Sequence, residues 1–145
     1  MKTLIIIRPD AVIRGLVGEI ITRFEKHGIR VAGLKITQLM KRQAEELYNM
    51  HKGKPFYEPL IETMTANPCV IVVLDTDVLD QASAIALVRK IVGDTDPAKA
   101  DMGTIRGDFG LRIDQNIIHA ADTKDSAERE IPLFFKKEEL FIYKE

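Results

Sequence analysis

Histidines are the side chains in this sequence best suited to forming a bond with a substrate, and the three of them differ in setting. His27 stands beside Gly28, where it is expected to complement a helix dipole, and His51 lies in a charged segment expected to face water. His119 ends a short apolar segment, Asn116-Ile117-Ile118. This position suits a catalytic histidine, and it also suits a structural one. His119 is therefore the candidate for catalysis.

Arginines supply a second chemical signal. Arg8 follows an apolar segment, Arg89 stands near the end of a predicted helix, and Arg106 lies in a stretch rich in glycine and polar residues. Planar guanidinium groups match the oxygens of phosphate, and the ends of helices and strands present them well. A local ion pair between Arg106 and Asp108 is an alternative role, and the two roles are compatible. These residues indicate a site for a small anion.

Composition excludes several other classes of protein. The 145 residues hold 21 lysines and arginines against 22 acidic residues, so the net charge of −1 argues against a general nucleic-acid binder. The single cysteine, Cys69, excludes a disulfide framework and a cysteine-rich metal site. The sequence contains no P-loop, no Gly-x-Ser-x-Gly elbow and no His-x-x-x-His pair. What stays open is a nucleic-acid-binding domain using the basic excess of residues 1–56.

No segment of the sequence has the length of a membrane anchor. The apolar run that begins at Leu4 stops at Arg8, too early for a secretory signal. The longest apolar run, residues 69–74, is far shorter than a bilayer requires. We therefore expect a soluble cytoplasmic protein with no membrane partner.

Hydrophobic periodicity gives the elements that must position these side chains. Short apolar runs rich in β-branched residues predict strands over residues 3–7 and 70–74 and a short strand from residue 117. Alternation predicts a half-buried strand over residues 29–38. Helical spacing predicts helices over residues 16–27, 42–50 and 55–66, one capped by Asp77 or Asp80 and closed by Gly93, and one opening at Ser126. Residues 94–115 show little periodicity, which predicts a long functional loop.

The order of these elements predicts one α/β domain over residues 1–145. Two β-α-β units, residues 3–38 and 70–120, favour an α+β sandwich of the ferredoxin-like class. In that fold helices pack on one side of a four-stranded antiparallel sheet. A doubly wound parallel fold is the alternative, and the lack of a glycine-rich turn after the first strand disfavours it.

Four blocks of sequence carry a family resemblance. They are residues 7–12 with 14–20, Tyr48 with 54–57, residues 93–97 with 103–109, and residues 116–122 with 126–131. Together they resemble the nucleoside diphosphate kinase family over essentially the whole chain. The resemblance implies ping-pong transfer of a γ-phosphate from a nucleoside triphosphate, usually ATP, to a nucleoside diphosphate.

By the same match, the reacting histidine would be His119, and two residues would assist it. His119 would be the nucleophile that becomes a phosphohistidine, and Glu130 would hold its other ring nitrogen and fix its tautomer. Tyr48 would lie beside the histidine and help to order the phosphate. The resemblance thus implies that His119 is catalytic, as the residue that carries the phosphate.

The resemblance also assigns the nucleotide contacts. The phosphates would lie among Arg8, Arg89, Thr95 and Arg106, whose charge stabilises a loose transition state. Mg²⁺ would arrive with the nucleotide phosphates and contact Asp122 through water. Asn116 and Arg8 would reach the ribose, and Phe56 and Ile113 would enclose the base. Stacking tolerates any base, so broad specificity is expected.

The sequence departs from the family pattern at two positions, Arg8 and Ala121. Most members have lysine at Arg8, and arginine is longer and planar. A small hydroxyl residue usually stands at Ala121, and its loss is expected to loosen the hydrogen bonding around Glu130. These departures motivate an alternative, a nucleotide-binding regulatory relative with weak or lost transfer. The resemblance implies a homo-oligomer, hexamer or tetramer, with residues 94–115 at subunit contacts.

Overall fold

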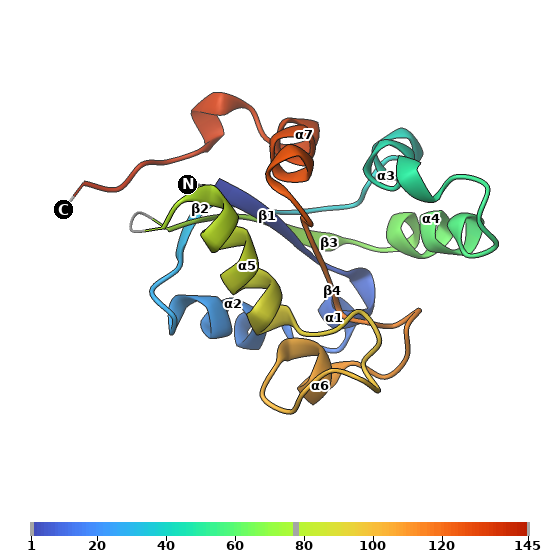
Figure 1. The fold of residues 1–145 in the computed structure, drawn as a ribbon. Helices are drawn as coiled ribbons and strands as arrows, with labels where there is room; N and C mark the ends of the chain where they lie inside the picture. Colours follow the sequence, from blue (N-terminus) through green and yellow to red (C-terminus); the bar gives the residue numbers. More distant parts are fainter. Residues whose placement is uncertain (1, 77–78, 145) are drawn as a thin grey trace.

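The computed structural model describes residues 2–76 and 79–144, and within them the backbone forms one four-stranded sheet. Every pairing between strands is antiparallel, in the order β2-β3-β1-β4 (Figure 1). The strands are β1 (Lys2–Ile7), β2 (Arg30–Thr37), β3 (Cys69–Asp75) and β4 (Ile118–Ala120). This arrangement confirms the ferredoxin-like prediction, and the parallel alternative is wrong.

Helices occupy most of the remaining chain. The predicted helices are present within a few residues of their expected bounds, and two short helices, α1 and α6, were not expected. The α-helices are α1 (Pro9–Ile13), α2 (Val17–Glu25), α3 (Lys41–Leu47), α4 (Tyr57–Ala66), α5 (Gln81–Val92), α6 (Ile105–Phe109) and α7 (Lys124–Phe134). Two 3₁₀ turns are η1 (Asn49–His51) and η2 (Lys137–Glu139).

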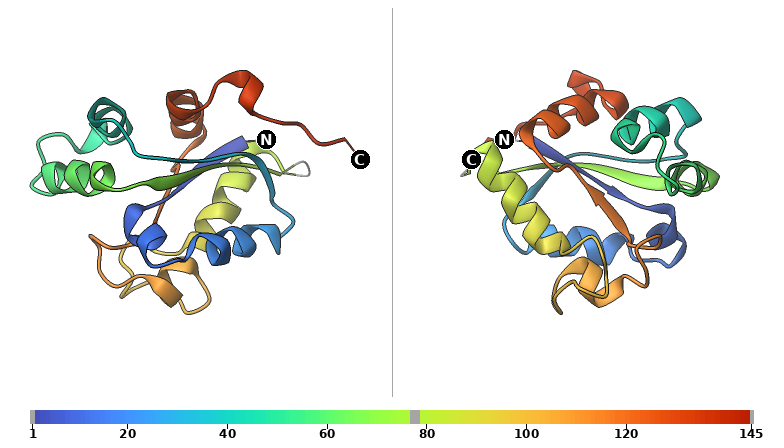
Figure 2. Two further views of the ribbon diagram at one scale, coloured as in Figure 1. Left: turned by 180° about the vertical axis from the view of Figure 1, so that it is seen from behind. Right: turned by 45° about the vertical axis from the view of Figure 1, so that its right-hand side comes forward.

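The helices cover both faces of the sheet, which corrects the expectation of helices on one side (Figures 1 and 2). Ile5 and Ile7 of β1 pack into one core with α2 and α5, whereas Leu4 and Ile6 pack into a second core with α3, α4 and α7. Successive strand side chains point to opposite faces, so a strand that is apolar at every position needs cover on both. The unbroken apolar runs of β1 and β3 therefore indicate a sheet covered on both faces.

Local signals explain the unexpected helix α1 and the start of α5. Pro9 ends β1 as expected, but it also opens α1, because proline fits the first turn of a helix, where no amide hydrogen is needed. Asp80 caps α5 by accepting from the amide of Ser83 at 2.8 Å. Asp77, the other proposed cap, lies outside the described residues.

A strained turn places the residues around β4. Ile117 has a φ of 77°, and the amide of Ile118 donates to the carbonyl of Asn116 at 2.8 Å. Together these define a γ-turn of the strained type. Asp10 Oδ2 accepts from the Ile117 amide at 3.1 Å, and the buried Ile117 side chain anchors the turn in the core. The turn therefore fixes how Asn116 and His119 are presented.

Gly93 ends α5 with a φ of 92° and ψ of 178°, a conformation that essentially only glycine adopts. A methyl group there would also collide with the Thr104 side chain. We predict that Gly93→Ala lowers the free energy of unfolding by about 3 kcal/mol, measured by chemical denaturation. Gly18→Ala is the matched control, because Gly18 has open space around it in α2, and it should leave stability equal or higher. Equal stabilities for the two variants would contradict the conformational argument.

Among the described residues, no helix is both long and apolar enough to cross a bilayer.

Candidate active site

A cavity of about 490 Å³ opens beside the ends of β1 and β4, and every residue proposed from the sequence for the site lines it. These residues come from segments spread along most of the chain, and several are buried although polar. The predicted residues are Arg8, Tyr48, Phe56, Arg89, Thr95, Arg106, Ile113, Asn116, His119, Asp122 and Glu130. The fold thus gathers them around one space large enough for a small molecule.

His119 points to the cavity because of the alternation along β4. Its neighbours Ile118 and Ala120 are buried in the core that contains α2 and α5, so the His119 side chain faces the other side of the sheet. Antiparallel pairing with Ile6 of β1 fixes its height along the sheet. The imidazole is therefore held by backbone pairing at the wall of the cavity.

Glu130 fixes the ring of His119. Its Oε1 lies 2.5 Å from His119 Nε2, and the glutamate side chain is only 2% exposed. A buried carboxylate accepts hydrogen bonds, so it selects the tautomer in which Nε2 carries the proton. The second ring nitrogen, Nδ1, is then left with its lone pair.

Tyr48 packs edge-on against the His119 ring, with 5.5 Å between ring centroids and an interplanar angle of 88°. It stands at the C-terminal end of α3 and is 5% exposed. Burial raises the pKa of the Tyr48 hydroxyl, with the charge of Glu130 adding to the effect and that of Arg8 opposing it. Tyr48 therefore keeps its proton and offers a neutral donor beside the imidazole.

Arg106 contributes a buried positive charge. Its guanidinium donates to the backbone carbonyls of Ile118 at 2.6 Å, Gly93 at 3.2 Å and Asn116 at 3.3 Å. Burial, and then the charges of Arg89 and Arg8, lower its pKa to about 10, so it remains charged at neutral pH. A cation held by neutral carbonyls and facing two further cations favours an anionic ligand.

The suggested ion pair between Arg106 and Asp108 is wrong. Asp108 instead pairs with Arg23 of α2 at 2.7 Å, and that bond holds α6 against α2. This pairing leaves the charge of Arg106 directed toward the cavity.

Arg8 and Asn116 form a hydrogen-bonded unit at the end of β1. The Arg8 guanidinium donates to Asp10 Oδ1, Asn116 Oδ1 and the Asp114 carbonyl at 3.0, 3.0 and 2.9 Å. The Asn116 amide donates to the Thr95 carbonyl at 3.2 Å. Arg8 thus fastens the loop that carries Asn116 as well as lining the cavity, a bridge that its planar, multidentate group makes possible.

Arg89 and Asp122 form an ion pair of 2.6 Å at the cavity wall. Both side chains are more exposed than Arg106. Arg89 can therefore exchange its carboxylate partner for a phosphate without desolvating a buried group.

Two apolar side chains stand exposed in the cavity. Phe56 is 48% and Ile113 58% exposed, and Lys54 Nζ lies 5.8 Å from the centroid of the Phe56 ring. Such exposure inside a cavity suits a flat, partly apolar ligand that covers both side chains.

His51 lines the same cavity, contrary to the expectation that it faces water. Its ring meets Phe56 edge-on at 5.0 Å and stacks on Tyr48 at 6.3 Å, and its Nδ1 is buried. Burial, followed by the charge of Lys54, lowers its pKa. The sequence signal was its position between Tyr48 and Phe56, two residues already assigned to the site.

Ala121 lies in a small buried cluster with Ile85 and Ala127. With alanine at this position, Glu130 Oε1 lies 2.5 Å from His119 Nε2. The expected loosening around Glu130 stays a prediction.

Comparison with known proteins agrees with this geometry. A sequence model described as nucleoside diphosphate kinase matches residues 1–140. Curated relatives with that name include those of Thermococcus kodakarensis (52% identity, 98% of this chain and 80% of the relative) and Methanocaldococcus jannaschii (49%, 97% and 96%). A solved halophilic nucleoside diphosphate kinase from Halobacterium salinarum in complex with CDP superposes with a TM-score of 0.93 at 37% identity, covering 100% of this chain and 93% of that one.

Proposed function

The chain belongs to the nucleoside diphosphate kinase family and is a phosphotransferase, and we propose that it works through a phosphohistidine at His119. The γ-phosphate of a nucleoside triphosphate, usually ATP, passes to the histidine and then to a nucleoside diphosphate. One cavity thereby serves both nucleotides in turn. The observation that carries this proposal is the 2.5 Å contact between Glu130 and His119 Nε2.

This contact supports Nδ1 of His119 as the attacking atom. With the Nε2 proton held by Glu130, the Nδ1 lone pair attacks the γ-phosphorus, an N–P bond forms, and the bridging P–O bond breaks. The nucleoside diphosphate leaves with the electron pair. Positive charge that develops on the ring is compensated by the Glu130 carboxylate. The second half-reaction reverses these steps with a different nucleoside diphosphate, which restores neutral His119.

The arginines supply electrostatic stabilisation. Arg106 is preorganised by its carbonyl contacts, Arg89 is free to move from Asp122, and Arg8 holds the ribose-facing Asn116 in place. Phosphoryl transfer has a loose transition state with charge spread over the oxygens, and fixed cations lower its energy. Thr95 lies beside these arginines, and its backbone carbonyl accepts a hydrogen bond from the Asn116 side chain.

Mg²⁺ fits this site as an ion carried by the nucleotide. Among the described residues there is no cluster of three or more side chains able to hold a metal ion, whereas the phosphates of a nucleotide provide hard oxygen ligands. Asp122, an exposed carboxylate at the cavity wall, would contact a water of that ion. Bound in this way, the ion would neutralise part of the phosphate charge.

We also propose a homo-oligomer, hexamer or tetramer, that acts in the cytoplasm, where nucleotide pools are interconverted. Large apolar side chains support self-association: Met102 and Leu111 project from the 94–115 segment, and Leu34 and Ile36 lie exposed on the edge strand β2. Sedimentation at micromolar concentration tests the assembly, and a monomer would contradict it.

The chemical proposal is tested by incubating the purified chain with γ-labelled ATP and Mg²⁺. We expect label on the protein that is lost in acid and retained in alkali, and that moves to GTP on adding GDP. A chain that takes up no label, or whose label GDP does not remove, would contradict the ping-pong scheme and support the regulatory alternative.

Phe56→Ala is predicted to raise the KM for ADP about 10-fold, with kcat changed less than 2-fold, because stacking is worth about 1–3 kcal/mol per base. A ribosyl 5′-diphosphate without a base should bind the variant and the parent protein equally. Phe141→Ala is the matched control, because Phe141 is exposed on the C-terminal segment and does not line the cavity. Steady-state kinetics check this, and an unchanged KM in Phe56→Ala would contradict the stacking role.

A further inference from the structure

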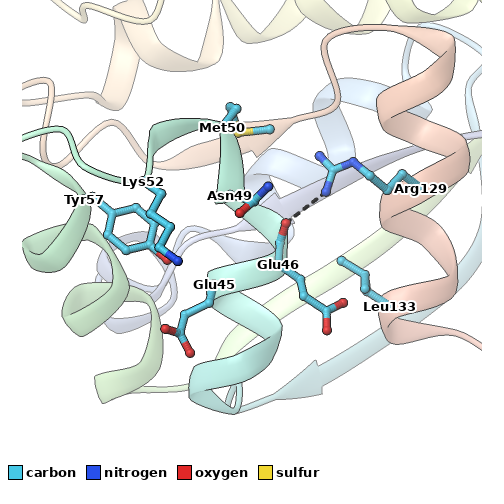
Figure 3. Close-up of a pocket in the computed structure, with 8 residues that line it drawn as sticks. All are labelled: Glu45, Glu46, Asn49, Met50, Lys52, Tyr57, Arg129 and Leu133. Carbon is cyan, nitrogen blue, oxygen red and sulfur yellow. Dashed lines mark hydrogen bonds between the residues drawn. The ribbon is translucent and has the colours of Figure 1, made fainter.

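A groove outside the active-site cavity contains Arg129, which contacts Glu130 on the side away from His119. The groove lies between α3, α4 and α7, has a volume of about 480 Å³, and is shown in Figure 3. Arg129 extends from α7 across it to the C-terminal end of α3 (Figure 3). None of the roles assigned above uses this residue.

Arg129 makes two contacts at once. Its Nη1 donates to the backbone carbonyl of Glu46 at 2.9 Å (Figure 3), and its Nη2 lies 3.7 Å from Glu130 Oε2. The Glu46 carbonyl belongs to the last turn of α3, where carbonyls lack the regular i+4 amide partner and a cation is favourable. Tyr48 follows directly at that helix end. Arg129 thus connects the C-terminal end of α3, where Tyr48 stands, with the Glu130 carboxylate that holds His119.

The charge environment makes the second contact consequential. Glu130 is 2% exposed, and His119 binds its Oε1. Burying a carboxylate is costly unless a positive charge or hydrogen-bond donors lie nearby, and Arg129 places a positive charge 3.7 Å from Oε2. The Arg129 side chain is 42% exposed, so its charge acts on Glu130 without the cost of burying a guanidinium.

We propose that Arg129 is a positioning residue that holds the Glu130 carboxylate in place beside His119, so that His119 Nδ1 stays available for phosphorylation. This inference rests on the proposed phosphohistidine. Arg129 does not line the cavity that would hold substrate, so it acts through Glu130. Other charged or titratable groups facing the His119–Glu130 pair are Arg8, Tyr48, His51, Arg89, Arg106 and Asp122.

The sign of the effect follows from the charge removed. Without the guanidinium, the His119–Glu130 pair holds its proton more tightly and binds it at a higher pH. We expect the titration of His119 to move upward by about 0.5 to 1 pH unit in Arg129→Gln. Arg129→Lys keeps the charge and should titrate within about 0.2 unit of the parent protein.

The test is an NMR titration of isotope-labelled histidine in the nucleotide-free chain, with His119→Gln used for assignment. Arg129→Met provides a second neutral variant, and Arg42→Gln is the matched control because it removes an exposed charge from the surface of α3. The acid limb of phosphohistidine formation should move with the titration. An unmoved His119 titration in both neutral variants, or a lysine variant that titrates like glutamine, would overturn the proposal. Because the titration needs no nucleotide, it decides the role of Arg129 even if the parent protein forms no phosphohistidine.

Discussion

Replacing His119 by glutamine is expected to lower phosphate transfer by at least about 10⁴-fold and to remove all acid-labile label. Glutamine is polar and close in size, so β4 and its pairing with Ile6 are kept while the nucleophilic nitrogen is lost. The Arg106, Arg89 and Arg8 cluster is untouched, so ADP should still bind. Transfer assays and calorimetric ADP titration measure the two effects separately.

The matched control for this variant is His27→Gln. His27 lies after α2, where its Nδ1 contacts the Arg23 carbonyl, and it does not line the cavity. Its substitution should leave transfer within about 2-fold, as expected for a surface position. Residual label on His119→Gln would place the phosphate on a different residue, with His51, the other histidine that lines the cavity, as the candidate.

Arg106→Lys is expected to lower kcat/KM by about 10²–10³-fold, because it removes a preorganised donor from the phosphate site. It should also lower the free energy of unfolding by about 2–3 kcal/mol. The guanidinium donates to three carbonyls, at Gly93, Asn116 and Ile118, and an ammonium group cannot reach all of them in that geometry. The charge is kept, so the loss measures geometry rather than net charge.

Denaturation with and without ADP checks the second prediction. The parent protein should gain stability from saturating ADP, and Arg106→Lys should gain much less. The pKa of Arg106 is about 10, so Arg106 keeps its charge from pH 7 to 9 and should not change the ADP affinity of the parent protein in that range. Above that range Arg106 loses its proton, and the affinity for ADP should fall. Undiminished kcat/KM in the lysine variant would contradict the proposed role of the guanidinium.

The sequence predicted the strands well because their signals are local, and the family resemblance named residues that the structure brings to one cavity. β-branched runs identified the strands of the sheet, and the motif around His119 identified a cavity wall built by β4 and α7. The long 94–115 segment was recognised as unusual, but α6 within it was not. Its five residues are too short to show a helical period, although Thr104 caps it by accepting from Gly107.

What the sequence did not predict depends on contacts between distant segments. Helices on both faces follow from the two-sided burial of β1, which the apolar run of residues 4–7 implied. The pairing of Asp108 with Arg23 joins positions far apart in the chain, so proximity to Arg106 was misleading. Arg129 reads as a surface residue of a helix until its neighbours across the groove are known.

The proposed mechanism depends most directly on which nitrogen of His119 carries the phosphate. Glu130 occupies Nε2, so the phosphorylated chain should contain one phosphate, bound to Nδ1 of His119. Phosphorus NMR of the ¹⁵N-histidine-labelled protein after reaction with ATP in mildly alkaline buffer distinguishes the two nitrogens through their coupling to phosphorus. The predicted result is a single Nδ1 phosphohistidine whose signal disappears on addition of GDP. Phosphate on Nε2, or on a residue other than His119, would contradict the account.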